Sequence, residues 1–319
     1  MKQKIALAVH GGAGTILKSS MTTELEKAYK AALEESLQKG YEILKNGGTS
    51  LDAVELSVRV LEDCPLYNAG RGSVFTADGR NELDASIMYG KDLSAGGIAE
   101  VTNIRNPISA ARAVMEKSEH ILMVGRGAED FARIYGLEIV EPGYFFTQER
   151  WDALQRVRET DPTSTELDHG SGKVTLKKVK AEKFGTVGAV AVDLDGNLAA
   201  ATSTGGMTNK KWGRVGDSPL IGAGTYANHL CAISCTGWGE YFIRLCLAKT
   251  VADLLEHKGY SLKKACNEVI LKKLPDLGGD GGLVAVDKDG NVAMPFSTEG
   301  MYRGYIKTNG KAVVEIYRG

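Results

Sequence analysis

Apolar residues follow two different spacings at the start of the chain. Residues 4–9 predict a buried strand, because Ile-Ala-Leu-Ala-Val at 5–9 is a continuous apolar run, and the strand leads into a glycine-rich turn. Over residues 25–44 the apolar positions instead recur on one broad face of a helix, where Thr23 and Glu26 form a capping-box pattern. A second helix of the same kind is predicted from Ser50 onward, ending before the next proline. The chain therefore opens with a strand followed by two amphipathic helices.

A polar stretch then divides the chain. It is preceded by strand-like segments near residues 83–89 and 97–103 and by two helices within 107–135. Residues 158–183 carry charges of both signs, small polar residues and glycine, with too few apolar side chains to bury. We interpret them as a mobile linker. A dense strand pattern begins immediately afterwards, at Phe184-Gly185-Thr186.

The second half contains an internal repeat, because residues 188–207 echo residues 282–301. Each copy predicts two apolar strands joined by an Asp-Gly turn, which is a strong hairpin signal. The Asp-x-Asp-Gly core also occurs in calcium loops, but neither copy has the closing glutamate that such a loop requires. Helices are predicted between the copies, at about 238–257 and 261–274. The pattern favours sheets covered by helices over a parallel doubly wound fold.

The composition narrows the function classes. At 319 residues, the chain is long enough for two domains or for one large layered structure. Lys and Arg total 39 against 40 Asp and Glu, so the chain lacks the basic surplus of a nucleic-acid-binding protein. The 39 glycines, against 7 prolines, indicate many tight turns and close backbone contacts. No apolar stretch approaches the roughly 20 residues that span a bilayer.

Cysteine usage points to a reducing compartment. The five cysteines are odd in number and scattered, without the paired spacings of a disulfide framework. The apolar run near the N-terminus is too short for a signal-peptide core. We therefore expect a cytoplasmic protein with neither nucleic acid nor membrane among its partners.

Common catalytic signatures are absent from the sequence. It contains no Gly-x-Ser-x-Gly, no His-Glu-x-x-His and no Walker A motif. The segment His10-Gly-Gly-Ala-Gly14 loosely resembles a phosphate cradle, but it lacks the spaced glycines of a dinucleotide fingerprint. His229, Cys231 and Cys235 resemble a zinc cluster, although the alternating pattern around the cysteines fits a buried strand better.

Thr186 is the main candidate nucleophile. A Gly-Thr pair at a strand start is structural in most proteins, but here a polar linker lies directly upstream of it. If the Gly185–Thr186 bond is cut, Thr186 gains a free α-amine, whose pKa of about 7.7–8.0 suits a general base. The hydroxyl and the amine of one residue then supply nucleophile and base, so no histidine is needed.

Two further segments carry recognition chemistry. Arg214 and Asp217 place a cation and an anion at a fixed separation. A surface turn with a local salt bridge is one interpretation, and a clamp for the carboxylate and ammonium of an amino acid is the other. Thr236 lies where a predicted strand leads into a predicted helix, and its hydroxyl and nearby N–H groups could hold an oxyanion there. Together these features describe an amide hydrolase for an amino-acid side chain.

Six motifs resemble those of the plant-type asparaginase or isoaspartyl peptidase family, and the similarity covers nearly all of the chain except the linker. They are His10-Gly-Gly-Ala-Gly14, Cys64-Pro-Leu-Tyr-Asn68-Ala-Gly70, Gly185-Thr-Val-Gly188, Thr202-Ser-Thr-Gly-Gly-Met-Thr208, Gly213-Arg-Val-Gly-Asp-Ser-Pro219 and Thr236-Gly237. The resemblance implies an N-terminal nucleophile hydrolase of the threonine type, with an α+β fold built as a four-layer αββα sandwich. It also implies self-cleavage into an α subunit (1–185) and a β subunit (186–319) that form one domain and assemble as (αβ)2.

The same resemblance assigns the site. Thr186 would be the nucleophile of self-cleavage and catalysis with Thr204 beside it, and Thr236 and Gly237 would form the oxyanion hole. The substrate would contact Asn68, Arg214, Val215, Gly216, Asp217, Thr236, Gly237, Trp238 and Gly239. No catalytic cofactor is implied, but a structural Na⁺ or K⁺ would be held by main-chain carbonyls of Leu61, Glu62, Cys64, Tyr67, Ala69 and Arg71. Arg71 and Trp238 depart from the family pattern, where an apolar residue and a smaller or polar residue are usual.

We therefore expect an isoaspartyl peptidase with L-asparaginase activity, acting through a β-aspartyl ester of Thr186. Glycosylasparaginase is the rival within the class. It is disfavoured by His10-Gly-Gly-Ala-Gly14, where that branch carries a Trp-containing segment, and by the lack of a secretory signal. A nucleotide- or metabolite-binding protein built on the first glycine loop is the rival from another class. Binding of ATP or NAD would support it, and ammonia release from asparagine would exclude it.

Overall fold

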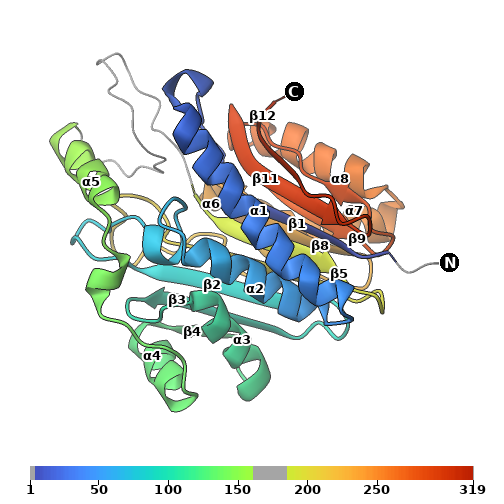
Figure 1. Cartoon of the computed structure of the whole chain (residues 1–319), viewed down its shortest axis with the longest axis horizontal. Helices are drawn as coiled ribbons and strands as arrows, with labels where there is room; N and C mark the ends of the chain where they lie inside the picture. The colour runs from blue at the N-terminus through green and yellow to red at the C-terminus, as the bar shows by residue number, and fades with distance from the viewer. Residues whose placement is uncertain (1–3, 161–184, 319) are drawn as a thin grey trace.

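The computed structural model describes residues 4–160 and 185–318, and its strands form two β-sheets. In the described chain the large sheet has the order β12-β11-β1-β5-β6-β2-β3-β4 and the small sheet the order β10-β9-β8-β7. Figure 1 shows how distant segments meet, with β1 (blue) beside β11 (red). The large-sheet strands are β1 (Ala6–Gly14), β2 (Leu83–Tyr89), β3 (Ala95–Val101), β4 (Leu122–Val124), β5 (Val187–Val192), β6 (Leu198–Thr204), β11 (Gly300–Lys307) and β12 (Val313–Tyr317). The small-sheet strands are β7 (Thr225–Ala227), β8 (Cys231–Gly237), β9 (Gly281–Asp287) and β10 (Val292–Ala293).

Helices cover the outer faces of both sheets. On the large sheet, Leu33 of α1 and Val54 of α2 share an apolar cluster with Leu7 of β1, and in Figure 1 both helices run across the strands. On the small sheet, Val251 of α7 packs in one cluster with Ile233 of β8. The α-helices are α1 (Thr23–Lys45), α2 (Ser50–Glu62), α3 (Pro107–Lys117), α4 (Gly125–Ile134), α5 (Gln148–Thr160), α6 (Gly239–Leu245), α7 (Leu247–Lys258), α8 (Leu262–Glu268) and α9 (Leu274–Asp276). Short 3-10 turns cover Lys18–Ser20, Gly70–Gly72 and Pro142–Phe145, and a π-helical turn covers Val269–Lys273.

The two sheets pack on each other through small and β-branched side chains. Because side chains alternate along a strand, Leu7 and Val9 of β1 face the helices, whereas Ala6 and Ala8 join the cluster between the sheets. The same inner cluster takes residues from both sheets, including Val190 of β5. The layers are therefore helix, sheet, sheet and helix, which confirms the expected four-layer αββα sandwich of the α+β class.

The internal repeat folds as expected, with one copy in each sheet. The first copy is the β5–β6 hairpin of the large sheet, and the second is the β9–β10 hairpin of the small sheet. In the first turn, the Asp193 carboxylate accepts the N–H of Asp195 at 3.1 Å and of Asn197 at 2.9 Å. In the second turn, Asp287 accepts the N–H of Asn291 at 2.9 Å. Because these carboxylates cap their own turns, the hairpin interpretation holds over the calcium loop.

Three local expectations differ from the structure. The cap of α1 is Thr22 and not Thr23, because the Thr22 hydroxyl accepts the third N–H of the helix at 3.1 Å. The helix expected over 238–257 is two helices, since Cys246 adopts φ +43° and breaks it. Helix α5 extends through Thr160, so the first residues of the expected linker are helical, and the rest of that linker lies outside the described residues. Among the described helices, none is long and apolar enough to cross a bilayer.

Candidate active site

The Gly185–Thr186 junction lies at the start of β5, in the middle of the large sheet. Thr186 is only 8% exposed. Its hydroxyl donates to the hydroxyl of Thr204 at 3.2 Å, at the end of the neighbouring strand β6. Thr204 Oγ1 also accepts the N–H of Gly206 at 3.0 Å. The two threonines that the resemblance pairs are thus in direct contact, and the N–H of Gly206 holds the Thr204 hydroxyl in place.

The carbonyl of Gly185 is held by two donors. Asn68 Nδ2 donates to it at 2.9 Å and Thr204 Oγ1 donates at 3.0 Å. Asn68 is fully buried and immobilised, since its Nδ2 also donates to the Gly206 carbonyl and its Oδ1 accepts the N–H of Val74. Gly185 itself has φ +111°, a conformation that residues with a side chain rarely adopt. Two donors at one carbonyl, next to a hydroxyl, form the arrangement that acyl transfer requires.

Arg214 and Asp217 lie on the turn between β6 and β7. Burial raises the pKa of Asp217 to about 7, although the charge of Arg214 acts to lower it. Asp217 Oδ2 is buried and has no hydrogen-bond partner in the described part of the chain. A buried carboxylate oxygen of this kind is costly unless a donor such as an ammonium reaches it.

A glycine keeps the space between the two charged groups open. A Cβ atom at Gly239, the first residue of α6, would lie 2.9 Å from Arg214 Nη2 and 2.9 Å from Asp217 Oδ1. On the turn itself, Val215 and Gly216 separate the two, and a Cβ at Gly216 would lie 2.8 Å from Arg214 Nη1. A cation and an anion thus face one small space that only glycine leaves free.

Thr236 and Gly237 end β8 of the small sheet. Thr236 is buried, and its Oγ1 accepts the N–H of Ala13, which lies on the glycine-rich end of β1, at 3.3 Å. Gly237 has φ +156°, and a Cβ there would lie 2.5 Å from the carbonyl oxygen of Asp280, the residue before β9. Trp238 follows as the cap of α6, and its ring packs edge-on to Tyr241 with centroids 5.6 Å apart.

The chain is similar to known proteins over almost its whole length. A family model described as asparaginase matches residues 3–316. The chain belongs to the asparaginase family. It is 51% identical over 316 residues to the isoaspartyl peptidase of Escherichia coli K12, covering 99% of this chain and 97% of that protein. The isoaspartyl peptidase of Salmonella typhimurium LT2 is also 51% identical, with 99% of both chains covered. The plant-type L-asparaginase of Pyrococcus furiosus is 43% identical over 305 residues, covering 95% of this chain and 96% of its own length.

Membership makes the chain an enzyme of a hydrolase family with the N-terminal nucleophile fold. It gives no support to a nucleotide-binding protein, and neither does the first glycine loop. A Cβ at Gly11 would lie 2.2 Å from the ring of Tyr67. The side chain is therefore missing at that position because an aromatic ring packs there.

The loop after α2 carries the carbonyls expected to bind a monovalent cation. It is unusually tight, because a Cβ at Gly70 would lie 2.3 Å from the Glu62 carbonyl and one at Gly72 would lie 2.0 Å from the Tyr67 carbonyl. The buried guanidinium of Arg150 donates to the carbonyls of Leu66 at 3.1 Å and Gly72 at 3.0 Å, neither of which belongs to the expected set. Three of the six expected carbonyls already accept N–H groups of the loop: Leu61 from Cys64 at 3.3 Å, Tyr67 from Ala69 at 2.9 Å and Ala69 from Gly72 at 3.2 Å. Each carbonyl keeps a second lone pair, so the set is compatible with a cation. The side chain of Arg71 is exposed, so its departure from the family pattern leaves its carbonyl unaffected.

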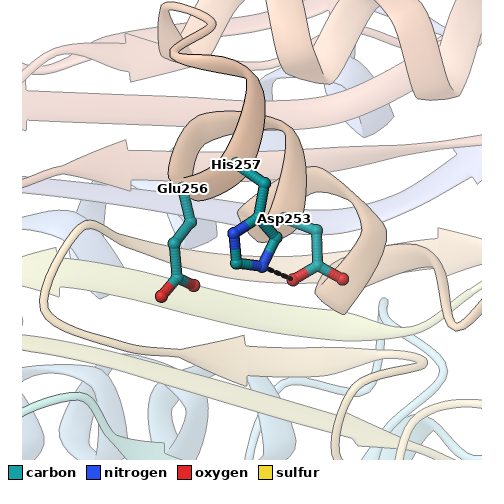
Figure 2. Close-up of side chains that lie close together, drawn as sticks. All are labelled: Asp253, Glu256 and His257. Carbon is teal, nitrogen blue, oxygen red and sulfur yellow. Dashed lines mark ion pairs between the residues drawn. The ribbon is translucent and has the colours of Figure 1, made fainter.

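One other group of metal-ligand side chains occurs in the described chain, on α7. Figure 2 shows Asp253, Glu256 and His257 on consecutive turns, and their ligand atoms lie within 4.8 Å of one another. His257 Nε2 lies 3.6 Å from Asp253 Oδ1, and the ammonium of Lys249 binds the same carboxylate. Because a lysine already neutralises the aspartate, we interpret the group as surface ion pairs spaced along one helix.

The cysteines of the zinc alternative lie inside the small sheet. Cys231 and Cys235 are fully buried on β8, and burial raises the pKa of the Cys231 thiol to about 12. A thiol with so high a pKa stays protonated and is a poor metal ligand. His229 is exposed before the strand, so the buried-strand interpretation holds.

Glu240 contacts Arg214 of the candidate site, although the sequence analysis did not single it out. Its carboxylate receives two bonds from Arg214, from Nε at 3.0 Å and from Nη2 at 2.8 Å. Burial acts to raise the pKa of Glu240, but the bonds and charge of Arg214 hold it below its usual value. The signal was the acidic residue directly after Gly239 at the helix start.

A buried charged cluster behind Thr204 was also missed. Asp84 lies opposite Thr204 in the β2–β6 register and is fully buried, which raises the pKa of its carboxyl. Lys210 is 1% exposed, and its Nζ donates to the Glu82 carbonyl at 3.2 Å. Strand β6, which ends at Thr204, is thus flanked by buried ionisable side chains. In the sequence, only the acidic residues Glu82 and Asp84 at a strand-like segment indicated this cluster.

Proposed function

We propose that the protein cleaves itself between Gly185 and Thr186 and then hydrolyses L-asparagine and β-aspartyl dipeptides. The observation that carries the proposal is the junction itself, where the Thr186 hydroxyl bonds to Thr204 and two donors hold the Gly185 carbonyl. The names of the relatives in Escherichia coli and Pyrococcus furiosus, an isoaspartyl peptidase and an L-asparaginase, support the same substrates.

Self-cleavage begins with attack of Thr186 Oγ1 on the Gly185 carbonyl carbon. The peptide C–N bond breaks, and the acyl group passes from nitrogen to oxygen as an ester while the nitrogen takes up the hydroxyl proton. Asn68 and Thr204 donate to the carbonyl oxygen, where negative charge develops. Water then hydrolyses the ester, which frees the Gly185 carboxylate and restores the Thr186 hydroxyl beside the α-amine released in the acyl shift.

Substrate hydrolysis uses the freed amine as base. It takes the proton of the Thr186 hydroxyl, whose oxygen attacks the side-chain amide carbon of the substrate and expels ammonia or an amino acid. Arg214 binds the α-carboxylate and Asp217 the α-ammonium, in the space that Gly239 leaves open. Thr236 and the N–H of Gly237 stabilise the oxyanion, and water opens the resulting β-aspartyl ester.

The two fragments would stay together as one domain. Strand β1 of the first fragment pairs with β5 and β11 of the second, so residues 1–185 and 186–319 share one sheet. We further propose assembly as (αβ)2, and a Na⁺ or K⁺ on the 61–71 loop that stiffens the turn carrying Asn68 without entering the reaction. A cytoplasmic location suits the five cysteines, all of which are free in the structure.

The test compares wild type with Thr186→Ala. The purified wild-type chain of 34.1 kDa should yield fragments of about 20 and about 14 kDa without added protease, and the smaller should begin at Thr186. It should release ammonia from asparagine, whereas Thr186→Ala should remain a single inactive chain. A full-length wild-type chain that hydrolyses asparagine would refute the N-terminal-threonine mechanism.

A further inference from the structure

A row of polar side chains lies between the two sheets, in a layer that is otherwise apolar. In the large sheet, the register aligns His10, Gly188, Thr202 and Ser86 across β1, β5, β6 and β2. The small sheet places Thr225 opposite Ser234. The histidine and all four hydroxyl side chains have no exposed surface, while Ala, Val and Met residues surround the row. Polar groups so deeply buried are costly unless every one of them is bonded.

These groups form one continuous chain of hydrogen bonds. His10 Nδ1 lies 3.0 Å from the Thr186 carbonyl and His10 Nε2 lies 2.9 Å from Ser234 Oγ. Ser234 Oγ lies 2.7 Å from Thr202 Oγ1, which receives a bond from Thr225 Oγ1 at 2.6 Å. The chain therefore begins at the main chain of the nucleophile and runs from the large sheet into the small one.

Its far end reaches the turn that carries Asp217. Ser86 Oγ lies 2.8 Å from Thr225 Oγ1 and 2.6 Å from the carbonyl of Ser218, the next residue after Asp217. The chain thus joins the backbone of the nucleophile to the backbone of the substrate turn.

The donors in this chain all point one way. The Thr186 carbonyl can only accept, so His10 Nδ1 must carry a hydrogen. Burial lowers the pKa of His10 to about 3, so the ring is neutral and Nε2 must accept from Ser234. Ser234 Oγ also lies 3.1 Å from the Ala201 carbonyl, but Nε2 has no other donor among the described residues, so the single hydrogen of Ser234 goes to the imidazole. Ser234 therefore accepts from Thr202, which in turn accepts from Thr225. One carbonyl therefore fixes the histidine tautomer and the direction of three hydroxyls.

Gly188 makes the crossing between the sheets possible. A Cβ at this position would lie 2.0 Å from Ser234 Oγ and 2.4 Å from His10 Nε2. Because Gly188 has no side chain, the hydroxyl of Ser234 can reach the imidazole of His10 from the other sheet.

We propose that His10, Ser234, Thr202 and Thr225 are positioning residues for Thr186 in the cleaved enzyme. Before cleavage, peptide bonds hold Thr186 on both sides. After cleavage its N-terminal side is free, and the bond from His10 to its carbonyl remains as an anchor next to the amine and the hydroxyl. The hydroxyl chain keeps the imidazole in the tautomer that donates this bond, and so keeps the amine in place to act as base. This inference rests on the proposed self-cleavage and hydrolysis.

The kinetic test uses Thr202→Val and Ser234→Ala, which remove one link each. Both should still cleave at the 185–186 bond, and kcat for asparagine should fall by about 10- to 100-fold while KM stays near the wild-type value. The control is Ser36→Ala, a buried serine that bonds the Ser57 carbonyl between α1 and α2. It should keep wild-type kinetics. Wild-type kcat in both link variants would overturn the inference, whereas a wild type that neither cleaves nor hydrolyses would refute the proposed function instead.

A spectroscopic test does not depend on the folding of any variant. Nitrogen NMR of wild-type protein labelled at its five histidines should show one ring in the neutral Nδ1–H form from pH 5 to 8.

A third test substitutes the histidine itself. His10→Asn, whose amide can place a donor near the Nδ1 position, should keep more activity than His10→Gln or His10→Leu. Absence of an Nδ1–H ring, or equal loss of kcat in all three variants, would contradict positioning through the Thr186 carbonyl.

Discussion

The guanidinium of Arg214 forms a double hydrogen bond with the carboxylate of Glu240, using Nε and Nη2. Nη1 lies on the other side of the group, where a Cβ at Gly216 would approach it to 2.8 Å. Glu240 therefore orients one edge of the guanidinium and leaves the rest for a ligand. The pair is partly exposed, with side-chain exposures of 19% and 48%, so its contribution is modest.

Glu240→Gln should raise KM for asparagine about three- to fivefold and change kcat little, because a neutral amide holds Arg214 less firmly. Self-cleavage should proceed as in wild type, since Glu240 does not contact the junction. Steady-state kinetics at low and high ionic strength would measure the effect, which salt should weaken in wild type. A lower KM in the variant would show instead that Glu240 competes with the substrate carboxylate.

Asp217 should control binding of the substrate ammonium around neutral pH. Because burial raises the pKa of its carboxyl to about 7, the group is mostly protonated below pH 7 and accepts an ammonium poorly. Affinity for L-aspartate as a competitive inhibitor should therefore rise with pH, by up to about tenfold per unit below pH 7, and level off above it. The inhibition constant of the cleaved enzyme from pH 5.5 to 8.5 measures this.

The control for this pH dependence is Asp217→Asn. It should bind L-aspartate weakly and lose the rise that ends near pH 7, which separates Asp217 from the Thr186 amine, whose ordinary pKa is about 7.7–8.0. N-acetyl-β-aspartyl peptides, which lack the ammonium, should be poor substrates of the wild type. Equal slopes in wild type and variant would remove Asp217 from the head-group site.

Asn68 should accelerate self-cleavage as one of the two donors to the Gly185 carbonyl. Removing a single oxyanion donor typically slows acyl transfer by about 100- to 1000-fold. Asn68→Asp keeps the size of the side chain and the acceptor for Val74 N–H, but it loses the donor. The full-length fraction, followed by denaturing mass spectrometry after synthesis, should therefore persist far longer than in wild type. Processing at the wild-type rate in a folded Asn68→Asp variant would exclude this role.

The sequence identified those features that depend on short segments. The two Asp-Gly hairpins and the strand that begins after Gly185–Thr186 are local patterns, and the structure shows them at the expected positions. The cleavage site and the Arg214–Asp217 clamp also come from local patterns, and their roles stay predictions. The αββα layering followed from motif resemblance, and the inner and outer faces of β1 follow from its alternation. Structural features formed within one short segment are therefore the ones that the sequence alone predicts best.

Contacts between distant segments were not predictable in this way. His10 meets Ser234, 224 residues later, only because β1 and β8 belong to sheets that pack face to face. Similarly, Glu240 meets Arg214 because α6 starts beside the β6–β7 turn. Two local errors have different causes. The cap of α1 was misplaced by one residue, from Thr22 to Thr23, and the helix expected over 238–257 is broken at Cys246, where the chain turns between α6 and α7.

The buried carboxyl of Glu62 should make folding stability depend on pH. Its Oε1 accepts the N–H of Ile108 at 2.9 Å and the hydroxyl of Ser203 at 2.7 Å, which ties the 61–71 loop to β6, the strand that carries Thr204. Burial raises the pKa of this group from 4.5 to about 8, with the hydrogen bonds opposing the shift. The folded state therefore favours the protonated form. The stability that this preference provides is fully present below pH 4.5 and is lost as the pH rises to about 8.

Glu62→Gln keeps an acceptor oxygen for both bonds and cannot ionise. Relative to wild type, it should be about equally stable at pH 5 and more stable at pH 8.5, by on the order of 1–3 kcal/mol. Urea unfolding measures this best in a Thr186→Ala background, where the chain stays in one piece and unfolding is intramolecular. The exposed Glu149→Gln serves as the matched control and should shift stability at neither pH. An equal difference between Glu62→Gln and its parent at both pH values would show that the buried carboxyl does not titrate in this range.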